Sequence, residues 1–242
     1  MQSCKSSSSE SGVERSWLHL FDRIFANAAA RRRLAAPFLS VPPAGYDPAR
    51  VPSILYSGKA TAGNWWLSTY LGSRTVKERR QCTADFLEKY VKTGEYSSAF
   101  WRFARGLSEC VAATTKSNVE PFQNLVWTNI CKIGVKQGNP NGYVFRAQRE
   151  LAIESLRLEI ERYRPRLVVF VTGDYGAEIV DAVVRDVGRR TWHEERGRDL
   201  FWWREPIGKM PAILWAYHPA RKPVSVLEVW LEQVSRLIRM TA

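Results

Sequence analysis

The sequence RLVVFVTG at residues 166–173 is an almost continuous apolar run, preceded by Pro165 and closed by Gly173. It lacks the alternation of a half-buried strand, so it predicts a strand of a parallel sheet that is covered on both faces. Three further runs share this character, at residues 54–56, 125–128 and 212–217. The sequence therefore predicts a central, mainly parallel sheet of four strands.

Helical patterns separate these runs. The expected helices cover residues 17–34, 76–91, 97–114, 144–164, 175–187 and 224–240, and residues 191–206 are typical of a β-hairpin. Such alternation of strands and helices predicts an α/β fold, a three-layer α/β/α sandwich. We expect one domain over residues 17–242, after a flexible N-terminal tail of residues 1–16.

Charge and hydropathy narrow the class of protein. The chain of 242 residues has 36 Lys and Arg against 24 Asp and Glu, a net charge of +12, and 45% of its residues are hydrophobic. This excess indicates either an acidic partner such as nucleic acid or an ordinary basic surface. No apolar run reaches the ~18 residues of a membrane span, and the Ser-rich start lacks a signal-peptide core. We expect a cytoplasmic monomer that is neither secreted nor inserted in a membrane.

Cysteine and histidine are too few and too scattered for a metal site. The cysteines are Cys4, Cys82, Cys110 and Cys131, and the histidines are His19, His193 and His218. These spacings match neither a paired-cysteine metal clamp nor a disulfide framework. We therefore expect reduced thiols and neither a metal nor an iron–sulfur cluster.

Ligands of open α/β sheets bind at the carboxyl ends of the strands, so the residues that follow each apolar run are candidate site residues. Small residues follow the first run, where the backbone can approach a ligand, although the stretch is not a Walker A loop. This stretch comprises Gly58, Lys59, Ala60 and Thr61, followed by Asn64, Trp65 and Trp66.

Polar residues also follow the second and fourth runs. The amide of Asn129 suits the edge of a nucleobase, and it equally suits a cap on the strand-end turn. His218 can donate a hydrogen bond to developing negative charge, and Arg221 and Lys222 come shortly after it.

In this order the three motifs resemble those of the uracil-DNA glycosylase superfamily. In that family a G-Q-D-P-Y-H-like or G-x-N/A-P-like loop follows the first strand, an L-L-L-N-like motif ends the second, and an H-P-S-P-L-S-like motif follows the last. The corresponding stretches here are GKAT at 58–61, LVWTN at 125–129 and HPAR at 218–221. The resemblance covers residues 53–240, and it implies a uracil-DNA-glycosylase-like fold that excises uracil or another deaminated or damaged base from DNA without a cofactor.

The resemblance also implies roles for individual residues. Asn129 would read the base edge and His218 would stabilise the departing base anion, while Trp65 or Trp66 would stack on the flipped base or pack in the core. Arg221 would enter the gap in the duplex. Phosphates would be held by Lys132, Arg146 and Lys222.

The chain departs from the family pattern in its first loop. Lys59 stands near the position of a water-positioning acid or amide, and the loop lacks the family's proline. Thr61, Asn64 and Asp174 are the alternative groups that could orient a water. Three hypotheses therefore stay open: a DNA glycosylase, a nucleic-acid- or nucleotide-binding protein on the same fold without efficient chemistry, and another small-molecule α/β enzyme.

Overall fold

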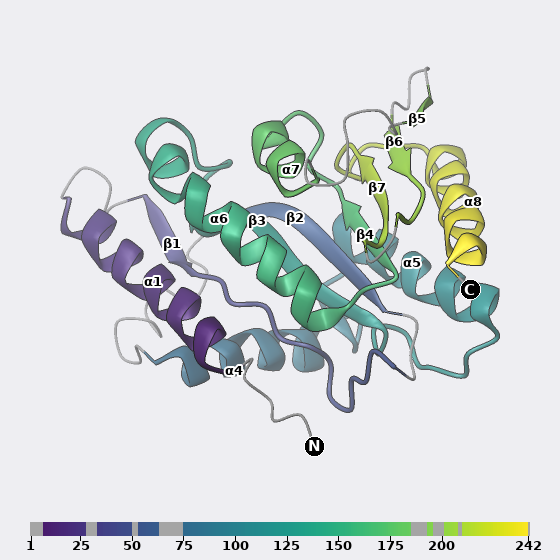
Figure 1. Cartoon of the computed structure of the whole chain (residues 1–242), viewed down its shortest axis with the longest axis horizontal. Coiled ribbons are helices and arrows are strands. Elements are labelled where there is room, and N and C mark those ends of the chain that lie inside the picture. Colours follow the sequence, from purple (N-terminus) through teal and green to yellow (C-terminus); the bar gives the residue numbers. More distant parts are fainter. Residues whose placement is uncertain are drawn as a thin grey trace.

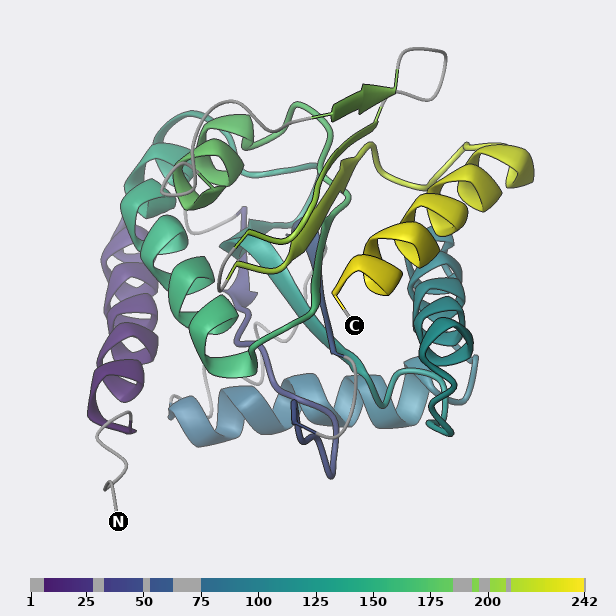
Figure 2. The same cartoon turned by 45° about the vertical axis from the view of Figure 1, so that its right-hand side comes forward.

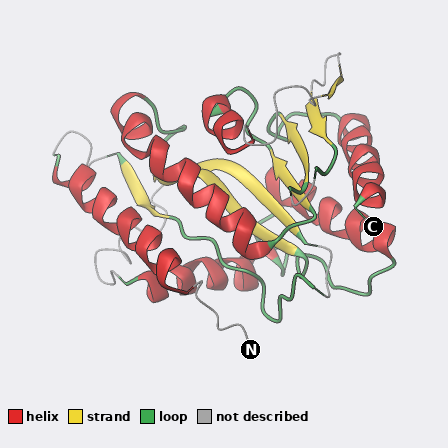
Figure 3. Ribbon diagram, viewed as in Figure 1, coloured by secondary structure: helices red, strands yellow, loops and turns green. Residues whose placement is uncertain are grey.

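A mixed β-sheet lies at the centre of the computed structural model (Figures 1 and 3). The structure describes residues 7–27, 33–49, 53–62, 75–184, 193–195, 201–207 and 210–241. Its strands are β1 (Leu34–Pro37), β2 (Ile54–Ala62), β3 (Leu125–Val135), β4 (Leu167–Phe170), β5 (His193–Glu195), β6 (Phe201–Arg204) and β7 (Ala212–Ala216). Within the described chain they form one seven-stranded sheet in the order β1-β3-β2-β4-β7-β6-β5.

The expected α/β class is confirmed, but the sheet is larger than the four strands predicted. The four predicted strands lie together and parallel as β3-β2-β4-β7. On one side β1 adds antiparallel to β3, and on the other β6 adds antiparallel to β7 and carries β5 with it. The antiparallel pair β5–β6 lies within residues 191–206 and confirms the predicted hairpin there, although its addition to the sheet was not predicted. Strand β1 was missed because it has four residues and gains its place by pairing with the distant β3.

Helices cover both faces of the sheet (Figure 2). The helices are α1 (Ser7–Ala26), α4 (Val76–Phe86), the π-helical turn η1 (Leu87–Val91), α5 (Ala99–Thr115), α6 (Gly142–Tyr163), α7 (Ala177–Val184) and α8 (Val224–Met240). In Figure 2, α1, α6 and α7 lie on one face, while α5 and α8 lie on the other. Two apolar cores result, one on each side of the sheet. This layering explains why the central strands are apolar without alternation.

Local sequence signals set several helix boundaries. At the start of α4, the Thr75 hydroxyl accepts a hydrogen bond from the Glu78 backbone N–H, and the Glu78 carboxylate accepts one from the Thr75 N–H. This reciprocal pair satisfies two backbone donors that a helix start otherwise leaves without partners. A local signal also sets the C-terminal end of α6. This helix ends at Arg164, which has a left-handed backbone conformation and directly precedes Pro165.

The prediction for the N-terminal segment is wrong in two respects. Residues 7–16 belong to α1 rather than to a flexible tail, and the helix ends at Ala26 rather than at residue 34. The Glu14 carboxylate lies 2.6 Å from an Arg80 guanidinium nitrogen on α4. Trp17 and Phe21 are buried on the same helix. The polar first half of this 20-residue helix gains stability from such tertiary contacts, which composition does not reveal.

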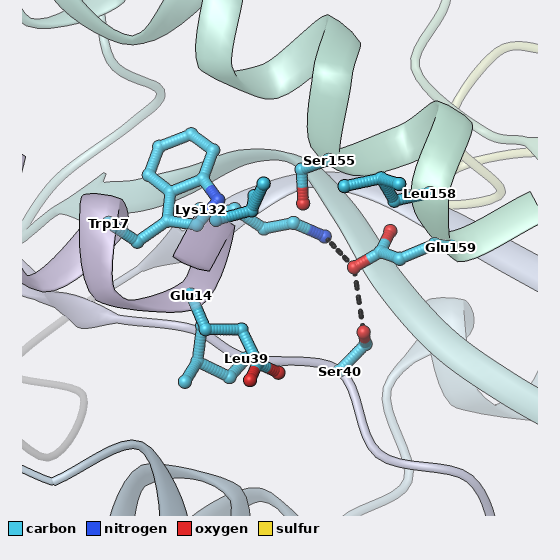
Figure 4. Close-up of a pocket in the computed structure, with 9 residues that line it drawn as sticks. Glu14, Trp17, Leu39, Ser40, Lys132, Ser155, Leu158 and Glu159 are labelled. Carbon is cyan, nitrogen blue, oxygen red and sulfur yellow. Dashed lines mark hydrogen bonds and ion pairs between the residues drawn. The ribbon is translucent and has the colours of Figure 1, made fainter. Parts of the chain in front are cut away.

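A buried ion pair connects β3 to α6 (Figure 4). The Lys132 ammonium lies 2.6 Å from Glu159 Oε1 and also donates to Thr128. The same carboxylate accepts hydrogen bonds from the hydroxyls of Ser40 and Thr128, each at 2.7 Å. Lys132 is fully buried, so its predicted contact with DNA phosphate is wrong. The burial of Lys132 could not be predicted from the sequence, because the carboxylate that neutralises it, Glu159, comes from a separate helix.

Substitution of one member of this pair tests its importance. Lys132→Met leaves the Glu159 carboxylate buried without its cation, and we expect the free energy of unfolding to fall by roughly 3–5 kcal/mol. The double variant Lys132→Met/Glu159→Met removes both charges and should recover most of that loss. Urea unfolding measures both, with Lys89→Met on the exposed face of η1 as the control. Equal losses in the single and double variants would contradict the interpretation.

Candidate functional site

Six of the predicted site residues line one pocket of about 370 Å³. They come from β2, from β3 and from the turn that follows β7, and they are Gly58, Lys59, Ala60, Thr61, Asn129 and His218. The carboxyl-terminal part of β2, the middle of β3 and the turn after β7 thus supply these residues, on the side of the sheet where open α/β folds bind ligands. The motif residues had been predicted to follow the strands, but Gly58–Thr61 and Asn129 lie within β2 and β3.

Asn129 lies beside Gly58 because β2 and β3 pair in parallel with these two residues in register. A Cβ atom at position 58 would lie 2.7 Å from Asn129 Oδ1 and 3.0 Å from Phe100 Cε2. Any side chain there would therefore push against Asn129 and the aromatic ring. Glycine at position 58 leaves the space that the amide occupies.

The Asn129 side chain is buried and incompletely satisfied. Its residue is 2% exposed, and its Nδ2 has no hydrogen-bond partner among the described residues. A buried donor without a partner costs about 1–3 kcal/mol relative to a satisfied one. Because Asn129 lines the pocket, its amide is the candidate group to pair with an acceptor on a bound ligand.

His218 presents the second donor of the pocket. Its Nδ1 accepts a hydrogen bond of 3.1 Å from the Ala220 backbone N–H, so the neutral ring carries its proton on Nε2. Burial lowers the pKa of His218, and the positive charge of Lys59 lowers it further. The Phe100 ring stacks on the imidazole with centroids 6.0 Å apart. The site therefore holds a neutral imidazole whose Nε2–H is a hydrogen-bond donor.

The turns after β4 and β7 are held together next to His218. The Gly173 N–H donates to the Ala216 carbonyl at 3.0 Å, and the Tyr217 hydroxyl donates to Asp174 at 2.9 Å. Gly173 has φ +55, and a Cβ there would lie 2.6 Å from the Tyr217 ring. Asp174 is engaged here and does not line the pocket, so the prediction that it orients a water is not supported.

An aromatic wall, missed in the sequence analysis, completes the pocket. Its rings belong to Phe86, Tyr96, Phe100, Trp101 and Trp127. The hydroxyl of the buried Tyr56 donates to the Phe100 carbonyl at 3.0 Å and connects β2 to the start of α5. These rings come from four separate segments. Only Trp127 belonged to a predicted motif, LVWTN at 125–129.

The remaining predicted residues are not among the described lining of the pocket. Asn64, Trp65 and Trp66 fall outside the described residues. Arg146 is exposed on α6 but does not line the pocket. Arg221, also exposed, follows His218 with φ 64, and the Lys222 ammonium lies 5.4 Å from the Tyr217 ring centroid. Arg221 and Lys222 thus flank the histidine without entering the pocket.

The described lining of the pocket carries a positive charge and no negative one. Besides the residues already named, the described lining includes Ser98 and Asn139, and it includes no Asp or Glu. Within the described ranges there is also no group of three His, Cys, Asp or Glu side chains that could hold a metal. The pocket therefore offers hydrogen-bond donors, aromatic surface and one lysine, a composition suited to a planar ligand with acceptor groups.

The comparisons with known proteins add no family assignment. No family model matches the chain, and no curated protein matches it. Among the described helices, none is both long enough and apolar enough to cross a membrane.

Two glycine substitutions test the geometry of the pocket. Gly58→Ala should lower the free energy of unfolding by about 1–3 kcal/mol, because the new Cβ meets Asn129 and Phe100. Gly134→Ala should cost more, since its Cβ would lie 1.9 Å from the Thr61 carbonyl oxygen, a backbone atom. Gly106→Ala in α5 is the control, with its nearest contact at 3.4 Å. Similar thermal unfolding of all three variants would contradict this geometry.

The protonation state of His218 is testable by NMR. We expect its imidazole to stay neutral, with the proton on Nε2, to a lower pH than an exposed histidine, because burial and Lys59 both disfavour the cation. Lys59→Met removes a nearby positive charge and should raise the pKa of His218. Lys89→Met, a distant substitution of the same kind, should leave it unchanged. A fall or no change in the pKa with Lys59→Met would refute the electrostatic contact.

Proposed function

We propose that this protein is a DNA base-excision glycosylase that hydrolyses the N-glycosidic bond of uracil or another deaminated or damaged base. One observation carries the proposal: Asn129 and His218, from distant segments, contribute unengaged hydrogen-bond donors to the same pocket. Both residues line a pocket of about 370 Å³, a size that accepts a nucleobase.

The strand arrangement supports a uracil-DNA-glycosylase-like fold. The parallel strands stand in the order β3-β2-β4-β7, so the first two in the chain are neighbours at the pocket. The three motifs that resemble the family lie on β2, on β3 and directly after β7. Their convergence is what that fold requires, and it adds to a resemblance that rested on short motifs.

The proposed mechanism uses the two donors at different stages. Asn129 Nδ2 donates to an acceptor on the base edge and holds the base in register. As the bond from the sugar C1′ to the base nitrogen breaks, negative charge grows on the base, and the His218 Nε2–H donates to an oxygen that carries it. A donor of this kind contributes about 10²–10³-fold in rate where it has been removed in other enzymes.

The aromatic wall supplies a place for the extruded base. Taking a base out of the duplex costs a few kcal/mol, which stacking on aromatic rings offsets in part. Two contacts fix the position of Phe100. Its backbone carbonyl accepts a hydrogen bond from the Tyr56 hydroxyl, and its ring stacks on the His218 imidazole. The proposed stacking surface is therefore Phe100 together with Trp127, while Trp65 and Trp66 stay predictions.

In this proposal, cationic side chains outside the pocket bind the phosphates of the DNA backbone. We assign them to Arg221 and Lys222, on the turn after His218, and to Arg146 on α6, in a chain of net charge +12. Contacts with phosphates release counterions, so binding should weaken steeply with salt. Arg221 is exposed beside the pocket and is the proposed side chain to fill the gap that the extruded base leaves.

A second candidate function follows from the missing carboxylate. None of the described lining residues is an acid that could activate a water or stabilise positive charge on the sugar. This favours a protein that binds an extruded or single-stranded base without efficient hydrolysis. The two functions share the pocket and differ only in whether a product forms.

An assay with labelled oligonucleotides separates them. DNA carrying uracil, hypoxanthine or xanthine is incubated with the protein, and abasic sites are then cleaved with alkali. We expect strand cleavage after alkali with at least one base, and a loss of about 10²-fold or more in the rate with His218→Ala or Asn129→Ala.

Matched controls make the same chemical changes at exposed positions. His19→Ala on α1 and Asn118→Ala, in the segment that precedes β3, lie away from the pocket and should retain full activity. Salt-dependent DNA binding without any abasic product would reject the glycosylase and leave the binding function. Absence of DNA affinity at low salt would reject both.

A further inference from the structure

The rim of the pocket carries an exposed tyrosine. Tyr96, in the connection between η1 and α5, is 51% exposed and is also one of the lining residues. Its ring contacts that of Phe86, with centroids 5.6 Å apart. Phe86 is buried and in turn contacts the rings of Trp101 and Trp127, at centroid distances of 6.0 and 5.9 Å. Tyr96 is thus the exposed end of a series of rings that begins inside the pocket.

Hydrogen bonds hold the backbone on both sides of this tyrosine. The Tyr96 N–H donates to the Tyr90 carbonyl at 2.8 Å, which closes the connection back onto η1. The Arg102 guanidinium donates to the Ser97 carbonyl, also at 2.8 Å, which fixes the following residue to α5. A tyrosine on a backbone held in this way offers a large contact surface and loses little conformational freedom when a ligand stacks on it.

A cation without a carboxylate partner lies in the same segment. Arg102, in the first turn of α5, is exposed and has no ion pair with another described residue. Lys89 and Lys92 on the preceding turn differ, because each lies within 4 Å of a carboxylate four residues earlier in the chain. Ser98, between Tyr96 and Arg102, is a lining residue of the pocket. The positive charge of Arg102 is therefore available to a phosphate close to the rim.

An exposed ring next to a cation is the combination with which proteins bind single-stranded nucleic acid, since bases stack on the ring and the cation binds the backbone. A base in a duplex already stacks on its neighbours and pairs with the opposite strand. Its face is therefore closed to Tyr96, whereas a base in a single strand can turn onto the ring. With one base in the pocket, the nucleotide that lies at the rim is the adjacent one.

We propose that Tyr96 and Arg102 form a second subsite at the rim of the pocket, which binds the adjacent nucleotide of a single strand. Tyr96 stacks on the base of that nucleotide, and Arg102 binds a phosphate beside it. This inference rests on the proposed function, because it takes the pocket to hold a nucleobase, and it applies equally to the glycosylase and to the binding protein. It makes single-stranded DNA the preferred ligand, a choice that the lining of the pocket does not make by itself.

Fluorescence anisotropy with two labelled ligands tests the stacking surface. The full chain is titrated against a short single strand with one central deoxyuridine and against the same sequence as a duplex. A 2′-fluoro group on that nucleotide destabilises a sugar cation and so prevents excision during the titration. Tyr96→Ala should weaken binding of the single strand by roughly fivefold or more and leave the duplex unchanged. Tyr96→Phe keeps the ring and should retain the affinity for both.

The role of Arg102 has a separate readout in the salt dependence of binding. The logarithm of the binding constant falls linearly with the logarithm of the salt concentration, and each phosphate contact with a single strand contributes about 0.7 to the slope. Arg102→Met should reduce the slope by about that amount, whereas Tyr96→Ala should leave it unchanged. Arg162→Met removes an exposed cation at the end of α6 that leads into β4, and it should leave both slope and affinity unchanged.

Deoxyuridine monophosphate, as a competitor, separates the subsite from the pocket. It fills the pocket alone, so its affinity should fall in Asn129→Ala and His218→Ala and stay unchanged in Tyr96→Ala. Equal losses of mononucleotide and single strand in Tyr96→Ala, or equal losses of single strand and duplex, overturn the subsite and leave the proposed function. Retention of full single-strand affinity in Tyr96→Ala does the same.

The reverse result distinguishes the two proposals from the other side. Single-strand binding that falls in Tyr96→Ala but not in Asn129→Ala or His218→Ala supports the stacking role of Tyr96 and rejects the base pocket. Absence of affinity for all three ligands in the unaltered protein at low salt overturns the pocket and the subsite together.

Discussion

The parallel pairing of β2 with β3 is the constraint on which the rest of the site depends. Its register sets Gly58 against Asn129 and Ala60 against Cys131, so the residues predicted to form a loop continue as paired strand. The absence of a side chain at Gly58 leaves room for the Asn129 amide and for the Phe100 ring. A slip of one residue would turn the amide to the opposite face of the sheet and dismantle the pocket.

The opposite face of β3 carries a different kind of constraint. Lys132 lies three residues after Asn129 and is held by Glu159 of α6, which also receives hydrogen bonds from Thr128 and Ser40. A buried charge pair of this kind adds little net stability, but separating its members is costly. It therefore ties the strand that carries Asn129 to the helix on its other side and disfavours alternative packings.

Within the pocket, the electrostatics favour a ligand that accepts hydrogen bonds. The neutral His218 and the Asn129 amide both donate, and Lys59 adds a positive charge where the described lining has no acid. These groups suit a base that becomes negative as it leaves. They do not by themselves suit a sugar that becomes positive, because the described lining has no carboxylate.

The sequence by itself determined the four parallel strands and the helical character of most connections, and it singled out Asn129 and His218, which the structure places in the lining of one pocket. Apolar runs and turn residues are local signals, and parallel strands place their carboxyl ends along one edge of the sheet. Only the tertiary structure decided that Lys132 is buried, that α1 includes residues 7–16, and that Phe100 stacks on His218. Each of these features depends on a partner from a distant segment, such as Glu159 or Arg80. A local sequence pattern does not show which distant residue will contact it in the folded chain.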